Sequence, residues 1–102
     1  MIRVSVIYNK ADNSNFDYDY YVKTHMPLAA NQFQPTKWEV DNVLKTGDGS
    51  VSPIHCVGYL YFNSLEHLET AMTDEAVGRV MADIPNYYSG GSPVILISEV
   101  FS

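Results

Sequence analysis

Hydrophobic and polar positions alternate in four short stretches of the chain and recur at helical spacing between them. Residues 2–8, 36–44, 56–62 and 94–101 have the two-residue period of strands, and a polar loop at 9–15 follows the first of them. Helical spacing covers a region from about 17 to 25 and a region from about 65 to 83 that divides near 74. This order predicts an α+β fold with β-α-β-β-α-β topology and a four-stranded antiparallel sheet.

Pro27 interrupts the first helical region. Proline lacks the backbone donor, its ring collides with the carbonyl four residues earlier, and the residue before it avoids helical angles. We therefore expect a break at His25-Met26, with Pro27 opening a second short helical turn that runs through Asn31. His25 is then expected at a helix end, on the same face as Tyr21.

Two helical regions cover only one face of a four-stranded sheet, yet stretches 56–62 and 94–101 are apolar on both faces. The uncovered patch would be larger than soluble monomers usually tolerate. We therefore predict a homodimer in which two sheets pack face to face and hide it. Loops that fold over this face are the alternative. The pattern leaves open which side of the last strand meets the partner.

Composition narrows the class of protein. A chain of 102 residues with 46% apolar and 18% charged residues predicts one globular domain, residues 1–102. The net charge is −6 and the six Lys and Arg residues are dispersed, which argues against nucleic acid and anionic membrane surfaces as partners. No apolar run has the roughly 20 residues of a membrane helix. Cys56, the lone cysteine, favours a reducing cytoplasmic location and is expected to pack as a small apolar residue.

Candidate chemistry centres on histidine. His25, His55 and His67 lack the i, i+3 or i+4 spacing of helical metal ligands, so no metal is expected. No phosphate-binding glycine loop or dinucleotide fingerprint is present, so we expect no cofactor. His25 is the candidate catalytic residue, acting as a neutral acid, base or hydrogen-bond partner in a pocket. The alternative is that His25 caps helix carbonyls, since a cation is favoured at a helix C-terminus.

Aromatic residues suggest a binding site. The chain has eight tyrosines and one tryptophan, and an aromatic cleft with a few hydroxyls suits a small apolar or aromatic molecule. The candidate substrate-binding residues are Tyr21, Trp38, Tyr59 and Tyr61, with Tyr59 or Tyr61 facing His25 from the sheet. Ordinary amphipathic packing is the alternative for most of the tyrosines.

Several segments resemble the EthD family of dimeric α/β-barrel proteins. They span nearly the whole chain: Phe16-Asp17-Tyr18-Asp19-Tyr20-Tyr21, Thr24-His25-Met26-Pro27-Leu28, Leu60-Tyr61-Phe62-Asn63-Ser64-Leu65-Glu66, Asp83-Ile84-Pro85-Asn86-Tyr87, Pro93-Val94-Ile95 and Ser98-Glu99-Val100. The resemblance implies a ferredoxin-like monomer that pairs through its sheet, a pocket between sheet and helices, and a role in the breakdown or biosynthesis of small organic compounds. It also marks His25 as a proton-handling residue.

Three functions remain open from the sequence. The first is a cofactor-independent enzyme that uses His25 for proton transfer on an aromatic, lactone or polyketide-like compound. The second is a non-catalytic accessory dimer that holds such a compound. The third is a structural dimer with a filled core. A second acid-base group beside His25 is not evident, because Asp17 lies two helical turns away, roughly 12 Å at about 1.5 Å per residue.

Overall fold

The structure, a computed structural model, describes residues 1–11 and 13–101. Asp12, in the loop predicted after the first strand, and Ser102 lie outside the described residues. The strands are β1 (Ile2–Asn9), β2 (Lys37–Asn42), β3 (Ile54–Phe62) and β4 (Val94–Glu99). The helical elements are α1 (Tyr18–Tyr20), the π-helical turn η1 (Tyr21–His25), α2 (Met26–Phe33), α3 (Leu65–Ala71), α4 (Asp74–Ala82) and the 3₁₀ turn η2 (Ile84–Asn86).

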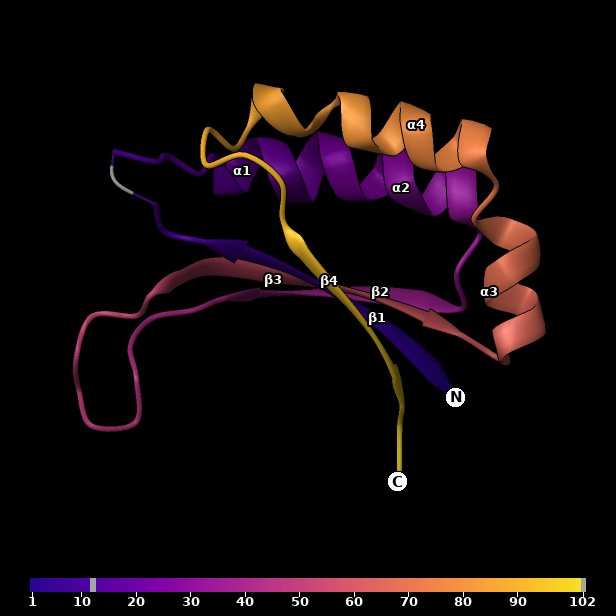
Figure 1. The fold of residues 1–102 in the computed structure, drawn as a ribbon, viewed down its shortest axis with the longest axis horizontal. Coiled ribbons are helices and arrows are strands. Elements are labelled where there is room, and N and C mark those ends of the chain that lie inside the picture. Colours follow the sequence, from indigo (N-terminus) through magenta and orange to yellow (C-terminus); the bar gives the residue numbers. More distant parts are fainter. Residues whose placement is uncertain (12, 102) are drawn as a thin grey trace.

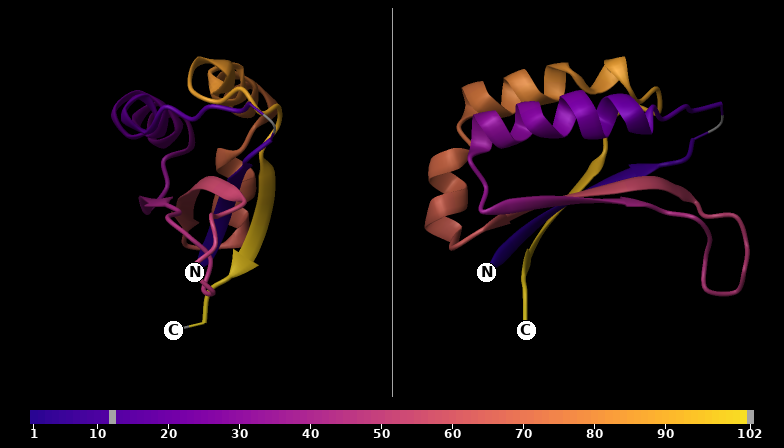
Figure 2. Two further views of the ribbon diagram at one scale, coloured as in Figure 1. Left: turned by 90° about the vertical axis from the view of Figure 1, so that its left-hand side faces the viewer. Right: turned by 180° about the vertical axis from the view of Figure 1, so that it is seen from behind.

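The four strands form one antiparallel sheet in the order β2-β3-β1-β4. Helices α1, α2 and α4 lie in a layer on one side of this sheet, and α3 lies at one end (Figures 1 and 2). The predicted α+β class, element order and antiparallel sheet are confirmed, and the strand order is that of a ferredoxin-like fold. None of the helices that the structure describes has the length and apolar content to cross a bilayer.

The register of the strands decides which side chains face the helices. Val4 of β1 lies opposite Leu60 of β3 and Ile97 of β4, and Val6 lies opposite Gly58 and Ile95. Because side chains alternate between the two faces, these even positions of β1 and β3 and odd positions of β4 share the helix-covered face. The main core lies on that face, between sheet and helices.

The predicted break in the first helix is wrong. The chain stays helical from Tyr18 to Phe33, and η1 replaces the break. In η1 the Met26 N–H bonds to the carbonyl of Tyr21, five residues back, so the turn is one residue wider than an α-helical turn. We attribute the wider turn to Pro27, which lacks a donor and would collide with the carbonyl four residues earlier in a regular helix. His25 therefore lies inside a continuous helix.

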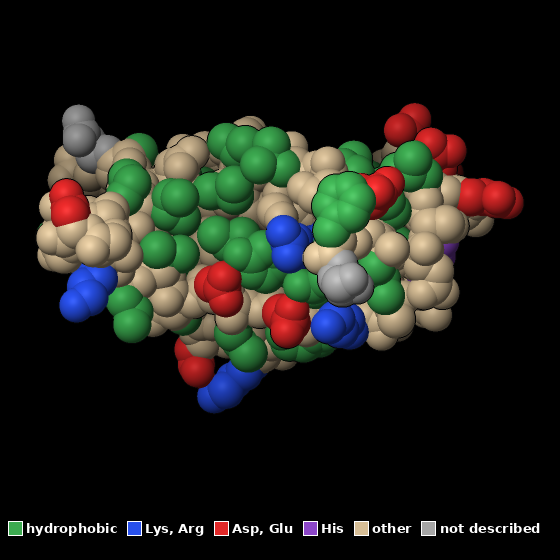
Figure 3. Space-filling model, turned by 90° about the horizontal axis from the view of Figure 1, so that it is seen from below, with side chains coloured by type: hydrophobic (Ala, Val, Ile, Leu, Met, Phe, Trp, Pro, Cys, Tyr) green, Lys and Arg blue, Asp and Glu red, His purple; other side chains and the backbone are tan. Residues whose placement is uncertain are grey.

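The opposite face of the sheet is not covered by helices, and Figure 3 looks onto it. Hydrophobic side chains gather along this open face, with acidic and basic side chains among them. Val94 and Leu96 of β4 belong to it by register, and they are 44% and 49% exposed. The predicted apolar character of the open face is therefore confirmed for β4.

Candidate functional site

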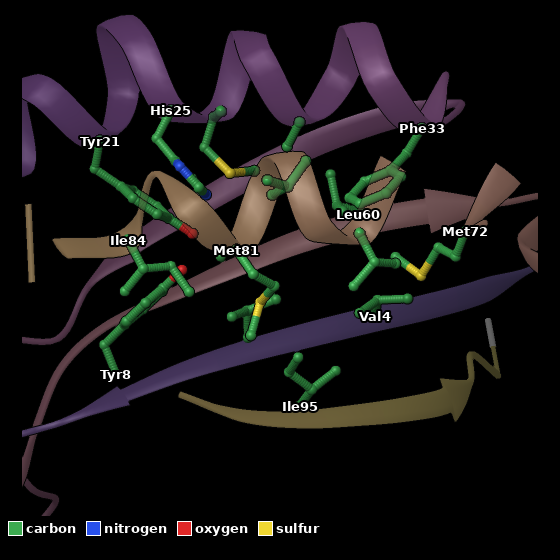
Figure 4. Close-up of a pocket in the computed structure, with 16 residues that line it drawn as sticks. Val4, Tyr8, Tyr21, His25, Phe33, Leu60, Met72, Met81, Ile84 and Ile95 are labelled. Atoms are coloured by element: carbon green, nitrogen blue, oxygen red, sulfur yellow. The ribbon is translucent and has the colours of Figure 1, made fainter. Parts of the chain in front are cut away.

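A pocket of about 80 Å³ lies between the helix-covered face of the sheet and helices α2 and α4 (Figure 4). Strands β1, β3 and β4 supply its floor, and the helices supply its other sides. The lining residues are Val4, Val6, Tyr8, Tyr21, His25, Met26, Ala29, Phe33, Gly58, Leu60, Met72, Val77, Val80, Met81, Ile84 and Ile95. None of them is Asp, Glu, Lys or Arg, so the pocket presents no full charge unless His25 is protonated.

The polar side chains of the lining gather at one end of the pocket. Figure 4 shows Tyr21 and His25 from the first helix beside Tyr8 from β1, whereas Phe33 and Met72 lie at the other end. The rings of Tyr21 and His25 are stacked, with centroids 5.2 Å apart and planes at 15°. Their spacing of four residues places both on the buried side of η1, as the sequence predicted. The pocket is therefore amphipathic along its length.

His25 is held by hydrogen bonds at both ring nitrogens. Its Nδ1 lies 2.9 Å from Oδ2 of Asp83, and its Nε2 lies 3.1 Å from the hydroxyl of Tyr87. The Tyr87 hydroxyl lies 2.7 Å from that of Tyr8. His25 makes no side-chain cap to the helix and is 3% exposed. The alternative that it caps helix carbonyls is thus wrong, because its ring nitrogens contact residues after α4 instead.

Asp83 is the residue directly after α4, and its carboxylate ends this chain of hydrogen bonds. Its Oδ1 accepts hydrogen bonds from the Tyr20 hydroxyl at 2.7 Å and from the Asn86 amide at 2.9 Å. Burial alone raises the pKa of Asp83, but the hydrogen bonds from Tyr20, Asn86 and His25 outweigh burial, and the net shift of the pKa is downward. Asp83 is therefore an ionised acceptor at neutral pH.

Burial lowers the pKa of His25 below its ordinary value of 6.5, although Asp83 opposes the shift. The imidazole is consequently neutral at pH 7. With the Asp83 carboxylate as acceptor, its single proton belongs on Nδ1, which leaves Nε2 as an acceptor for the Tyr87 O–H. A neutral, oriented imidazole next to an apolar pocket has the properties of a general base.

The lowered pKa of His25 predicts the pH dependence of stability. The folded protein disfavours protonation of this ring relative to the unfolded chain, so its contribution is complete above pH 6.5 and declines as the pH falls towards the folded pKa. We expect a smaller free energy of unfolding at pH 5 than at pH 7.5 in urea titrations. The loss should be smaller in His25→Gln, and an equal loss in both proteins would contradict the assignment. Asp83, with its depressed pKa, contributes a further loss only at more acidic pH.

An aromatic cluster surrounds the polar end of the pocket. The ring of Tyr8 lies within 5.0–5.6 Å, centroid to centroid, of Phe16, Tyr21, Tyr87 and Tyr88. Burial raises the pKa of Tyr8 to about 12, and it raises the pKa of Tyr21 further above its ordinary value. These hydroxyls are therefore neutral hydrogen-bonding groups across the physiological range.

Two predicted binding residues lie on the wrong face. Tyr59 and Tyr61 point to the open face, because Gly58 and Leu60 occupy the helix-covered positions of β3. The Tyr59 hydroxyl donates to Asp41 at 2.8 Å, and the Tyr61 hydroxyl donates to Glu39 at 2.7 Å. The prediction that either tyrosine faces His25 is thus wrong.

Trp38 lies opposite Leu60 on the helix-covered face and is partly buried against the core, but it does not line the pocket. Of the predicted site residues, only Tyr21 and His25 meet there. Cys56 is fully buried, and burial raises the pKa of its thiol to about 12, as expected of a packed side chain. Among residues 1–11 and 13–101, no three His, Cys, Asp or Glu side chains are grouped to hold a metal ion.

Sequence reasoning missed three residues of the site: Tyr8, Asp83 and Tyr87. Asp83 and Tyr87 are 58 and 62 positions from His25 in the chain. The only signal for them was the segment Asp83-Ile84-Pro85-Asn86-Tyr87, one of those that resemble the EthD family. The alternation of residues 2–8 placed Tyr8 at the last core position of a strand. Nothing in the adjacent sequence indicated a hydrogen-bonding role for it.

The chain belongs to the EthD family. The family model of the EthD domain matches residues 12–91, which confirms the predicted family. A protein of Rhodococcus erythropolis named as an uncharacterized 11.0 kDa protein in the thcB-thcC intergenic region is 29% identical over 100 residues. The match covers 97% of this chain and 95% of that protein.

Two solved structures share the fold. An EthD-like protein of Ralstonia eutropha is 26% identical, with a TM-score of 0.85 over 99% of this chain and 92% of that one. An ethyl tert-butyl ether D (EthD) family protein of Bacillus halodurans is 21% identical and has a TM-score of 0.75 over 99% of both chains. The ferredoxin-like fold is therefore shared with proteins that have the same family description.

Proposed function

We propose that this protein holds a small, uncharged and largely apolar molecule in the pocket beside His25, as a cofactor-independent participant in the catabolism or biosynthesis of that molecule. The observation that carries the proposal is the convergence of Tyr8, Tyr21 and His25 at one end of an otherwise apolar pocket. A small number of polar groups in an apolar enclosure is the usual composition of a small-molecule site.

The absence of charged lining residues supports an uncharged ligand, because a buried ion without a partner costs several kcal/mol or more. The pocket is small at about 80 Å³, but Met72 and Met81 line it. Methionine side chains are flexible and adapt to a guest, so the pocket can enlarge where these two side chains line it. Substituted benzenes, short lactones and small polyketide-like compounds fit these requirements.

Proton transfer is the chemistry that these residues supply. Asp83 fixes the ring and tautomer of His25, and it would also stabilise the imidazolium that forms when His25 accepts a proton. We propose that His25 is the acid-base residue of a reaction that needs no cofactor. The lone buried thiol suits a reducing compartment, and we propose a cytoplasmic location.

A non-catalytic accessory role is the second candidate, and one observation favours it. Both ring nitrogens of His25 already have partners, in Asp83 and Tyr87. In that arrangement His25 stabilises the aromatic end of the pocket, and the protein holds its ligand without reaction. A measurement of turnover separates the enzyme from the accessory protein, because both functions predict that the ligand binds.

Thermal melts with a panel of ethyl-substituted benzenes and short alkyl lactones test the proposal. We expect at least one compound to raise the Tm of the wild type, and to raise the Tm of His25→Gln by less. His67→Gln is the control, since His67 lies on α3 and outside the pocket. Equal shifts in all three proteins would remove His25 from the site. A panel without any shift in the wild type would contradict the pocket as a ligand site.

We also propose that two copies pack through the open face. Two carboxylates on this face already have partners within the chain, since Glu39 and Asp41 accept hydrogen bonds from tyrosines. Arg3 lies over the Tyr59 ring at 5.3 Å, and its Nε is buried without a hydrogen bond to any described residue. A partner sheet would cover Leu96, which is 49% exposed in the single chain.

A further inference from the structure

The direction of the hydrogen bonds at the polar end of the pocket restricts the chemistry of the ligand. Asp83 Oδ1 accepts two hydrogen bonds, from Tyr20 and Asn86, and Oδ2 faces His25 Nδ1 at 2.9 Å. A carboxylate with donors at both oxygens is an acceptor only. The His25 proton is therefore on Nδ1, and its Nε2 can only accept.

This assignment fixes the protons that follow. The Tyr87 hydroxyl, 3.1 Å from Nε2, must give its single hydrogen to His25. Its oxygen then accepts from the Tyr8 hydroxyl at 2.7 Å. The Tyr8 hydrogen is used in turn, so the Tyr8 oxygen has only lone pairs for other partners. Tyr21 packs edge-on against Tyr8 at this end, with ring centroids 5.3 Å apart and planes at 77°.

We propose that the polar end of this pocket selects a ligand with a hydrogen-bond donor, an aromatic or enolic O–H or an N–H, and rejects one whose polar group is only an acceptor. Every hydrogen in the chain from Tyr8 to Asp83 points towards the carboxylate, so the Tyr8 oxygen offers a ligand only lone pairs. A ketone, ester or ether oxygen placed there meets lone pairs and loses its hydrogen bonds to water without replacement. The inference therefore narrows the proposed ligands to those with a donor and disfavours simple lactones. The inference rests on the proposed function, because it assumes that a small molecule occupies this pocket.

Three isosteric probes test the inference: 4-ethylphenol, 4-ethylaniline and 4-ethyltoluene. The first two donate a hydrogen bond and the third does not. A fourth probe, 4-ethylbenzaldehyde, presents an acceptor alone. Titration calorimetry with the wild type should show the phenol and the aniline binding about tenfold more tightly than the toluene, the size of effect expected for one buried hydrogen bond. The aldehyde should bind no more tightly than the toluene.

A substitution at Tyr8 tests whether this residue causes the preference for donors. Tyr8→Phe removes an acceptor oxygen at the pocket end, so the preference for phenol over toluene should shrink. Tyr18→Phe is the matched control, because the Tyr18 hydroxyl donates to the backbone carbonyl of His55 and does not line the pocket. If Tyr8→Phe does not fold, the ranking of the four probe affinities for the wild type still tests the inference.

The outcomes separate the two proposals. If all four probes bind with similar affinity, the donor rule is overturned and the pocket remains a small-molecule site. If the aldehyde binds as tightly as the phenol, the pocket presents a donor and the assigned direction of the chain is overturned. If none of the four binds, the proposed small-molecule function fails and this inference fails with it.

Discussion

Replacing Leu96 with lysine is expected to separate the proposed dimer into monomers. Leu96 lies on the open face of β4, opposite Ser5 of β1, and is 49% exposed in the single chain. If two sheets pack through this face, the new ammonium group would be buried at the contact without a carboxylate placed for it. The wild type should have about twice its chain mass in light scattering at micromolar concentration, and Leu96→Lys should have its chain mass.

Thr70→Lys is the control for this experiment, because it adds the same charge at an exposed position of α3 away from the sheet. That variant should remain a dimer. A wild type that is monomeric at tens of micromolar would contradict the proposed dimer, and so would a Leu96→Lys protein that keeps the dimeric mass. Either result would mean that the apolar open face is covered in another way or is tolerated.

Replacing Gly58 with alanine is expected to destabilise the protein clearly, although it adds a single methyl group. A Cβ at this position would overlap the hydroxyl of Tyr21, whose ring is 1% exposed. That ring packs against Tyr8, Phe16 and Tyr87 and has little room to move. Overpacking of this kind costs about 2 kcal/mol, or roughly 10 °C in Tm for a domain of this size.

Two further variants make this prediction specific. Tyr21→Phe in the Gly58→Ala background removes the overlapping oxygen and should recover much of the loss. Gly78→Ala is the matched control, since a Cβ at this α4 position meets no atom within 4 Å. Alanine is there expected to stabilise the helix by about 0.5–1 kcal/mol. A Gly58→Ala protein as stable as the wild type, or a double variant no more stable than Gly58→Ala, would contradict the contact.

Local patterns determined most of the fold, because strands and helices follow from the spacing of apolar positions. The two-residue period predicted all four strands, with ends that differ by a few residues from the observed ones. The spacing of four residues also placed Tyr21 and His25 on one face. These features depend on neighbours in the chain, which the sequence displays directly.

Two errors have physical causes that lie outside any local pattern. A proline in a helical region can be accommodated by a break or by a wider turn, and packing of Tyr21, His25 and Ala29 against the core favours the turn observed in η1. Alternation in β3 showed that Tyr59 and Tyr61 share a face, but which face meets the helices depends on pairing with β1.

The residues that hydrogen-bond to His25 could not be predicted from the sequence, because they are far from it along the chain. Asp83 and Tyr87 come from the segment that follows α4, and they reach His25 only because α4 packs beside α2. A carboxylate at position 83 has no local feature that distinguishes it from other acidic residues of the chain. Contacts between distant segments carry the chemistry of this site, whereas local spacing carries the fold.

The protonation of His25 is the property on which both the proposed function and the selectivity for donors depend. Long-range ¹H–¹⁵N correlation NMR of the histidine side chains reports it directly at pH 7.5. We predict a neutral His25 ring with the hydrogen on Nδ1 and the ¹⁵N shift of an unprotonated acceptor at Nε2, as the contacts with Asp83 and Tyr87 require. Two equivalent protonated nitrogens, or a hydrogen on Nε2, would contradict the account.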